Sequence, residues 1–302
     1  MRNYLLTLFI LVGISIKGFA QLDPLYNQYL FNQGMINPAY NGAYDVFSAT
    51  LISRLQWVGI DGAPRTNTLN LSSSIVNNKV GVGLTVLNDN FGVNNNTEIQ
   101  LSYAYKLSWN DKVLSMGLQT GLLNYNYDYS KVDYEFVDDP IIAGANDNST
   151  QENFGFGLWL MSKTYAVGFS VPRILDVDIE DGMSESTRYR RHYYFSAAYL
   201  FDQFIGLKFK PSILVRSVKG TTSLDLNAQF LLNEILWVGA SFRNFDSAGL
   251  NAQIEINDQF RAGYSFELPI NTVELGGFGT HEFMITMDLE LLDRHAKSRK
   301  YF

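Results

Sequence analysis

The chain has 302 residues, no cysteine, 14% aromatic residues, 24 glycines and a net charge of −7. Without cysteine it has neither a disulfide framework nor thiolate metal sites, and its negative charge argues against a nucleic-acid partner. Past residue 20 no run of about 18 apolar residues occurs, so the sequence predicts no membrane-spanning helix.

Residues 1–20 have the composition of a secretory signal peptide. Arg2 precedes a short apolar stretch over residues 5–16, and small residues lead up to Ala20. We expect cleavage after Ala20 and export of the remaining chain of about 280 residues. A retained N-terminal anchor is the alternative, but the apolar stretch is too short to span a bilayer.

Residues 21–43 precede the first expected strand and combine turn signals with side chains that favour burial. Asn-Pro at Asn37-Pro38 and Asn-Gly at Asn41-Gly42 predict turns, whereas Phe31, Met35, Ile36 and Tyr40 are apolar or aromatic. If the chain after residue 43 closes into a barrel, we expect this segment to form a plug in its lumen or a collar on its periplasmic side. A stopper without a binding role is the alternative. The candidate lumen or collar residues are Asn37, Pro38, Tyr40, Gly42, Gln56 and Trp57.

From residue 44 onward, segments of about ten residues alternate apolar and polar side chains, which is the period of a β-strand with two different faces. In residues 223–232, for example, Leu224, Leu226 and Phe230 alternate with Asp225 and Asn227. The pattern predicts about fourteen strands, an even number. They lie near 44–57, 64–75, 79–88, 95–108, 112–124, 151–161, 164–171, 188–200, 204–217, 221–232, 234–243, 247–256, 259–268 and 281–291.

The connections between these strands are predicted to alternate in length. Tight links such as VNNK and WNDK alternate with longer ones, namely NDNFGVNNN, 125–150, 172–187 and 269–280. Short turns on one side and long loops on the other are typical of an outer-membrane β-barrel with periplasmic turns. The fold class predicted is therefore all-β, a transmembrane antiparallel up-and-down barrel with polar strand faces toward the lumen.

Aromatic residues near strand ends, including Trp57, Trp109 and Trp159, indicate an interfacial girdle, and Trp237 lies close to a tight turn. A soluble exported sandwich or propeller is the alternative fold. The barrel is favoured because strand length suits a tilted crossing and because closure removes the sheet edges.

The longest predicted loop carries acidic and aromatic side chains that could dock a partner at the cell surface. The candidate partner-binding residues are Tyr127, Tyr129, Tyr134, Glu135, Phe136, Asp138 and Asp139. A solvated acidic surface is the alternative. Residues 176–182 resemble half of a calcium loop, but the glycine comes one place late and Thr187 stands where a bidentate glutamate is needed, so a solvated loop is favoured.

No catalytic or cofactor-binding motif is evident. His192, His281 and His295 have no ligand spacing, and neither Gly-x-Ser-x-Gly nor a phosphate loop occurs. We expect no enzyme, no cofactor and no metal; a barrel-embedded protease or lipase is a minor alternative.

The sequence ends in a basic run, 292–302, after the last predicted strand. Its candidate residues are Arg299, Lys300, Tyr301 and Phe302. We expect a periplasmic tail that docks a partner; a disordered tail, or a terminal aromatic that supports barrel insertion, are the alternatives.

Two N-terminal stretches, DPLYNQYLFNQGMINPAYNGAYD and RLQWVGIDGAPRTNTL, together resemble the signature of the PorP/SprF family of type IX secretion system outer-membrane proteins of Bacteroidetes. The resemblance continues through GVGLTVLNDNFGV and GTHEFMITMDLEL to SRKYF, which departs from the family's usual Ser-Pro-Arg-Tyr/Phe-Phe at Arg299 and Lys300. It covers essentially the whole chain after residue 20.

The resemblance implies an outer-membrane barrel that serves export or surface anchoring of a particular secreted cargo, such as a gliding adhesin, recognised through its C-terminal domain. Periplasmic secretion or gliding components and outer-membrane lipid are the other implied partners. A small-solute diffusion porin and a scaffold for periplasmic motor components are the alternatives. The domains expected are 1–20, signal peptide; 21–43, N-terminal segment; 44–291, barrel; and 292–302, tail.

Overall fold

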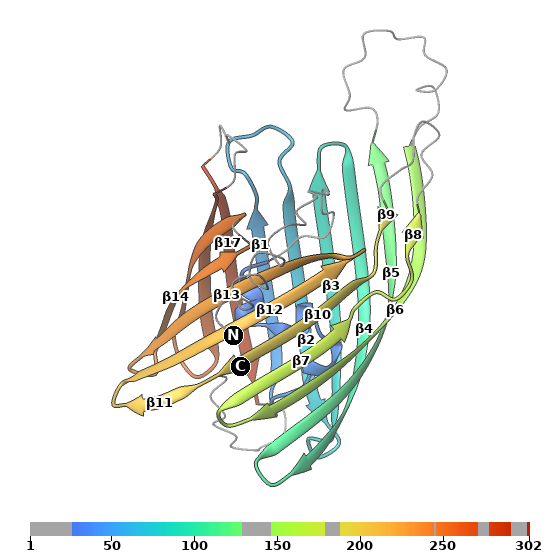
Figure 1. Ribbon diagram of the computed structural model, residues 1–302. Coiled ribbons are helices and arrows are strands. Elements are labelled where there is room, and N and C mark those ends of the chain that lie inside the picture. The colour runs from blue at the N-terminus through green and yellow to red at the C-terminus, as the bar shows by residue number, and fades with distance from the viewer. Residues whose placement is uncertain (1–25, 129–145, 179–187, 245, 271–277, 291–300) are drawn as a thin grey trace, which may run out of the picture.

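The computed structural model describes residues 26–128, 146–178, 188–244, 246–270, 278–290 and 301–302. Three short 3-10 helices precede the strands: η1 (Gln28–Leu30), η2 (Gln33–Met35) and η3 (Pro38–Tyr40). The strands, coloured along the chain in Figure 1, are β1 (Phe47–Leu55), β2 (Arg65–Ile75), β3 (Val80–Phe91), β4 (Asn94–Trp109), β5 (Lys112–Asp128), β6 (Asn146–Ser162), β7 (Tyr165–Val171), β8 (Val177–Asp178), β9 (Arg188–Tyr189), β10 (His192–Tyr199), β11 (Phe201–Phe204), β12 (Leu207–Val218), β13 (Thr221–Leu232), β14 (Leu236–Arg243), β15 (Ser247–Glu255), β16 (Phe260–Pro269) and β17 (Thr280–Leu289).

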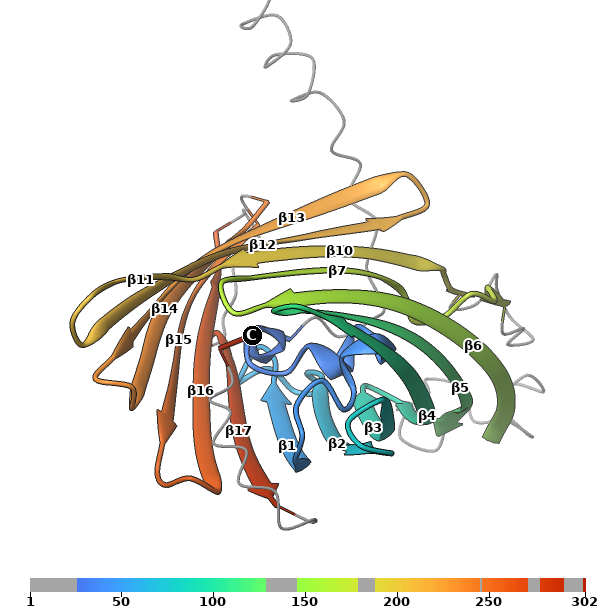
Figure 2. The ribbon, with the colours of Figure 1, turned by 90° about the horizontal axis from the view of Figure 1, so that it is seen from below.

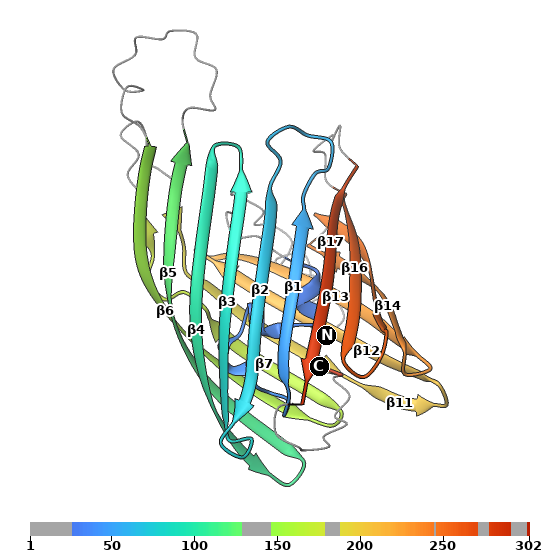
Figure 3. The same cartoon turned by 180° about the vertical axis from the view of Figure 1, so that it is seen from behind.

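Within the described residues, fourteen strands close into one antiparallel barrel (Figure 3). Successive strands pair in chain order from β1 to β7 and from β12 to β17, and β1 pairs with β17 from Phe47↔Leu289 to Leu55↔His281. Strand β10 lies between β7 and β12, which completes the ring. The short β11 continues β10 beyond Leu200 along the same neighbour, β12, while β8 and β9 form a separate hairpin. The predicted number of strands and their antiparallel order are confirmed.

Burial along the strands is the inverse of that in a soluble protein. In β13, Leu224, Leu226 and Phe230 are exposed on the outside, whereas Asp225 and Gln229 are buried on the inside. The same division holds in β4 and β17. An apolar outer surface around a polar interior is the arrangement of a membrane-spanning barrel, so the predicted orientation of the polar faces is confirmed. No helix in the described part of the chain is long and apolar enough to cross a membrane.

Left-handed backbone conformations close the tight turns. Asn233 and Glu234, the first two of the three residues between β13 and β14, have φ angles of 47° and 60°. Lys219 and Gly220, the two residues between β12 and β13, have φ angles of 46° and 83°. Two consecutive residues with positive φ match the right-handed twist of the flanking strands. Such short connections keep neighbouring strands in a fixed register.

One predicted long link is wrong. The stretch NDNFGVNNN forms the ends of β3 and β4 around a turn at Gly92 and Val93 instead of a loop. Its asparagines continue the ladder because their side chains bond across it, as when Asn88 Nδ2 donates to Asn95 Oδ1 at 2.8 Å. Polar residues can extend a strand here without a loop.

Of the three tryptophans predicted for an aromatic girdle, Trp159 is contradicted by its burial, while the girdle positions of Trp57 and Trp109 stay a prediction. Trp57 and Trp109 are exposed, but Trp159 and Trp237 are buried on the inner face. The inward pair lies near the tight turns, where strand phase, and not distance from the strand end, decides which way a side chain points.

Candidate functional site

Residues 26–44, here called the inner segment, lie inside the ring of strands (Figure 2). Asn37 begins η3, with its Oδ1 accepting a hydrogen bond from the N–H of Ala39 at 3.0 Å, and Pro38 occupies the first helical position. Asn32 caps η2 in the same way through the N–H of Gly34. Asparagine caps and proline starts favour short turns, so the segment reverses direction while its aromatic rings remain free to pack.

The later half of the inner segment rests on a row of small residues, here called the glycine row, that crosses four neighbouring strands. Gly117 and Gly157 are paired on β5 and β6, and a Cβ on either would come within 2.4 Å of Ala39 N or 2.0 Å of Asn37 Oδ1, respectively. The backbone of η3 therefore touches the wall directly. Asn37 Nδ2 also donates to the Leu158 carbonyl at 3.0 Å. The members of the row are Gly81, Ala104, Gly117 and Gly157.

The start of the inner segment, at Asn27 and Gln28, is attached to the wall through hydrogen bonds to a charged side chain and not through close backbone packing. The Glu282 carboxylate accepts the N–H of Asn27 at 2.9 and 3.0 Å, the N–H of Gln28 at 3.0 Å and the Ser265 hydroxyl at 3.1 Å. The guanidinium of Arg54 pairs with the same carboxylate, and both side chains are almost fully buried. A buried carboxylate with this many donors satisfies the main-chain N–H groups that begin η1.

A second ion pair extends this attachment around the wall. Arg243 Nε lies 3.0 Å from Asp225 Oδ1, its Nη1 lies 3.2 Å from Glu267 Oε2, and its Nη2 donates to Asn27 Oδ1 at 3.1 Å. Asn27 Nδ2 in turn donates to Glu267 Oε2 at 2.6 Å. The five charged residues that meet the start of the inner segment, here called the charged patch, are Arg54, Asp225, Arg243, Glu267 and Glu282.

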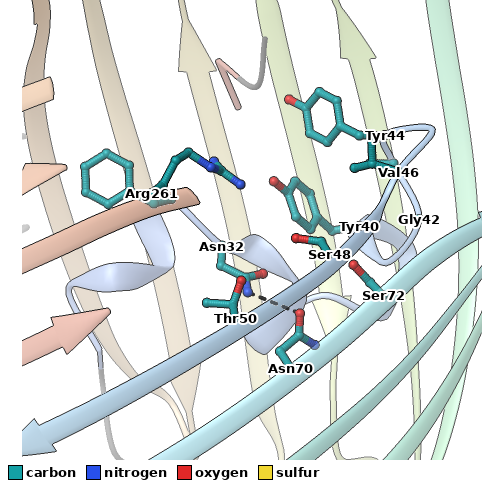
Figure 4. A pocket seen from close by; sticks show the side chains of 12 residues that line it. Asn32, Tyr40, Gly42, Tyr44, Val46, Ser48, Thr50, Asn70, Ser72 and Arg261 are labelled. Atoms are coloured by element: carbon teal, nitrogen blue, oxygen red, sulfur yellow. Dashed lines mark hydrogen bonds between the residues drawn. The ribbon is translucent and has the colours of Figure 1, made fainter. Parts of the chain in front are cut away.

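Little space is left between the inner segment and strands β1 and β2. The cavity there has a volume of about 20 Å³, and Figure 4 shows Asn32 next to Thr50 and Asn70, and Tyr40 next to Ser48. Asn32 Nδ2 donates to Asn70 Oδ1 at 3.1 Å. A cavity of this size admits about one water molecule.

Tyr301 and Phe302 also lie inside the ring, next to the inner segment (Figure 2). The hydroxyls of Tyr40 and Tyr44 each donate to the main-chain oxygen of Phe302 at 2.8 Å. Burial raises the pKa of both phenols, that of Tyr44 to about 12, so both remain protonated donors at neutral pH. The segments before β1 and after β17 are thus joined to each other.

The predicted collar residues separate into two places. Asn37, Pro38, Tyr40 and Gly42 lie in the inner segment, and Lys106 Nζ donates to the Gly42 carbonyl. Gln56 and Trp57, by contrast, belong to the β1–β2 loop at the opposite end of β1. There Val58 N donates to the Gly279 carbonyl at 2.9 Å, which ties this loop to the start of β17.

The predicted partner-binding residues fall mostly outside the described residues. Tyr127 lies near the end of β5, where the backbone pairs it with Asn94 and Asp147. Tyr129, Tyr134, Glu135, Phe136, Asp138 and Asp139 lie outside the described residues, as do Arg299 and Lys300 of the tail and most of 176–182.

Strands β5 and β6, which flank the predicted docking loop, are 17 residues each and reach the long-loop end of the barrel (Figure 1). Strand β6 pairs with β5 along its whole length but with β7 only from Phe156 onward. In the described part of the chain, residues 146–153 thus have no strand partner on the β7 side. Unpaired strand edges can accept a further strand from another chain.

Sequence reasoning missed the charged patch and the glycine row. Glu282 sits on the polar face of a strand that alternation identified, so its inward direction was readable from strand phase. The pairing of Glu282 with Arg54 could not be predicted from the sequence, because it depends on the register of β1 against β17.

The fold and the family were compared with known proteins. The family model described as type IX secretion system membrane protein PorP/SprF matches residues 18–287. A comparison with curated proteins gives no significant match. Among solved structures, the CymD monoaromatic hydrocarbon channel aligns over 90% of this chain and 93% of its own, at 10% identity and a TM-score of 0.51. The outer membrane protein Omp33 of Acinetobacter baumannii aligns over 82% and 99%, at 10% identity and a TM-score of 0.49. The likeness to CymD supports the barrel fold, and the match to the family model covers most of the sequence. The chain therefore belongs to the PorP/SprF family of type IX secretion system membrane proteins and forms an outer-membrane β-barrel.

Proposed function

We propose that this barrel is a cargo-specific partner of the type IX secretion system, which supports export or surface anchoring of a secreted adhesin. The family is a membrane component of that system and not an enzyme family, and membership implies interaction with the secretion machinery. The finer proposal is that one cargo protein docks at the long-loop end through its C-terminal domain.

The observation that carries this proposal is the occupied interior. The inner segment is hydrogen-bonded to both sides of the wall, through the N–H of Asn27 to the Glu282 carboxylate and through Asn37 Nδ2 to the Leu158 carbonyl. A diffusion porin needs an open water-filled lumen, whereas an anchor needs a rigid barrel that presents its outer loops. The buried inner segment favours the second role.

The β5–β6 hairpin is the proposed docking element. It lies at the long-loop end, which in barrels of this class faces the cell exterior, and in the described part of the chain β6 has no strand partner on its β7 side over residues 146–153. The sequence between its strands carries Tyr134, Glu135 and Phe136, and aromatic side chains are enriched at protein interfaces.

Co-purification from detergent-solubilised outer membranes tests the proposal. The tagged protein is compared with a variant in which Tyr134, Glu135 and Phe136 are replaced by serine, and with a control, Asp258→Ser, in the exposed turn between β15 and β16. We expect one large secreted protein, bound through its C-terminal domain, with the wild type and the control, and its loss with the loop variant. Recovery that is equal in all three preparations would refute docking at this loop.

A small-solute porin is the alternative, since CymD is described as a channel. Conductance in planar bilayers separates the two roles. A large steady conductance in the purified wild-type barrel, together with no bound cargo, would favour the porin. The scaffold alternative depends on the tail, and deletion of residues 293–302 tests it: loss of motor association with surface cargo retained would favour scaffolding.

A further inference from the structure

At the interior end near the tight turns, Tyr301 and Phe302 are held by polar and aromatic side chains of the inner segment and the wall. We propose that these two residues act as a releasable latch that holds the inner segment in the lumen. The residues that form this site, here called the socket, are Tyr40, Tyr44, Lys208, Lys210 and Trp237.

Phe302 is recognised through its backbone and its ring. Besides the two phenol donors to its main-chain oxygen, its N–H donates to the Tyr44 hydroxyl at 3.2 Å. Its side chain is buried in a cluster with Tyr40, Trp159 and Trp237. Recognition of main-chain atoms together with one deep aromatic pocket is how proteins bind short peptide segments.

Tyr301 is held by the opposite wall. Its main-chain oxygen accepts from Lys210 Nζ at 2.8 Å, and its hydroxyl accepts from Lys208 Nζ at 2.9 Å and donates to Glu234 Oε2 at 3.2 Å. Lys208 Nζ also lies 4.4 Å from the centre of the Tyr301 ring, within the range of a cation–π contact. The wall therefore contacts Tyr301 at its backbone, its hydroxyl and its ring face.

The two residues bridge parts of the molecule that are distant in sequence. Tyr40 and Tyr44 belong to the inner segment, whereas Lys208 and Lys210 belong to β12 and Trp237 belongs to β14. Lys210 Nζ stands 4.5 Å from the Trp237 ring centre, so the wall side of the socket is itself preassembled. The inner segment also contacts this side of the wall directly, since Lys210 Nζ donates to the Leu30 carbonyl at 3.5 Å. Removal of the latch takes away the additional links through Tyr301 and Phe302 without touching the strand ladder.

The attachment is non-covalent and its contacts are those of a peptide ligand, so a separate peptide of the same sequence competes for the socket. The latch is independent of cargo docking, because it lies at the tight-turn end, and its test uses the purified barrel without cargo.

Site-specific labelling tests the latch directly, since the natural chain has no cysteine. Ala43→Cys places a single thiol in the inner segment, against the socket cluster. Its reaction rate with a bulky maleimide is measured in the folded, purified barrel, in the parent and in a Phe302→Ala variant. Loss of the ring and its packing should raise the rate by at least about tenfold, because the open state of the segment gains population.

Two further samples keep the test decisive. Tyr44→Phe retains the complete chain but removes the hydroxyl that both donates to and accepts from Phe302, and it should also accelerate labelling. Asp258→Ala, in an exposed turn at the same end, should leave the rate unchanged.

Peptide rescue distinguishes a latch from a merely loosened barrel. Added peptide SRKYF, matching residues 298–302, should restore slow labelling in the Phe302→Ala variant, and SRKAA should not. Unchanged labelling in both Phe302→Ala and Tyr44→Phe, or equal protection by the two peptides, would overturn the proposal.

Discussion

The two halves of the inner segment are attached to the barrel wall by different interactions: charge-assisted hydrogen bonds at the start and close packing against glycines in the later half. At its start, Asn27 and Gln28 meet the buried carboxylate of Glu282, and specificity comes from charge and hydrogen-bond direction. At its later half, Asn37 and Ala39 lie against glycines, and specificity comes from the absence of side chains on the wall. The first attachment tolerates small shifts in position but no loss of charge. The second tolerates changes in charge but no added volume.

The largest effect should follow from breaking the charge-based attachment. Glu282→Gln removes the nearer of the two carboxylates beside the buried Arg54 and leaves only Glu267, at 4.0 Å, so we expect the free energy of unfolding to fall by about 3 kcal/mol. Urea unfolding in lipid vesicles, followed by tryptophan fluorescence, measures this change. Glu152→Gln, at an exposed position on β6, is the matched control and should stay within about 0.5 kcal/mol of the parent. Equal stability of the two variants would mean that the patch does not hold the segment.

The shape-based attachment should break with added volume. Gly157→Val places side-chain atoms where Asn37 Oδ1 now lies, so we expect a loss of about 1 to 3 kcal/mol, with η3 displaced from the wall. Limited proteolysis of the folded barrel reports the displacement as cleavage within residues 26–44. Ala228→Val adds the same kind of volume on the outer face and should leave the inner segment protected; cleavage in both variants would contradict the contact.

A smaller change sharpens the role of Asn37, which serves both as a cap and as a donor to the wall. Asn37→Ala loses both functions and should cost about 1 kcal/mol or slightly more. Asn37→Ser keeps a cap acceptor for Ala39 but loses the donation to Leu158, and should cost less. The two unfolding free energies, measured under the same conditions, rank the contributions; a serine variant as damaging as the alanine variant would show that the wall contact dominates.

The smallest effect concerns pH at the socket. Burial raises the pKa of Tyr44 to about 12, against an ordinary value of about 10. A raised pKa means that the neutral phenol is favoured in the folded state. Its stabilisation is therefore complete below pH about 10 and is lost as the pH rises to about 12. The difference in tyrosinate absorbance between wild type and Tyr44→Phe should titrate near the higher value, and a midpoint near 10 would show an exposed phenol.

The strands were predictable because their two faces meet opposite environments. Residues 221–232 were predicted as a strand at the bounds that the structure gives, since Leu224 and Phe230 alternate with Asp225 and Gln229 without interruption. Ends were less predictable. Strands β5 and β6 run four and five residues past their expected ends at 124 and 151, to Asp128 and Asn146. In β6, residues 146–152 are polar on both faces and leave no alternation to read.

The interior could be predicted only in part. Asn37-Pro38 and the neighbouring aromatic residues indicated a turning segment with buried rings, which agrees with η3 and the burial of Tyr40. The position of Phe302 beside Tyr40 could not be predicted, because it depends on how the ring closes and not on any local pattern. The same limit explains why Gln56 was grouped with Asn37: closeness in sequence does not reveal that β1 carries it to the other end.

The alternation of apolar and polar residues also bears on how the chain reaches its destination. Past residue 20 the sequence has no continuous hydrophobic segment that the insertion machinery of the inner membrane would retain as a transmembrane helix. The unfolded polypeptide can therefore cross the inner membrane completely. The outer apolar belt comes into being only when the last strand, β17, pairs with the first. Closure of the barrel thus converts a polypeptide that can be exported into one whose apolar outer surface requires a bilayer. Because export precedes closure, the protein is not retained in the inner membrane.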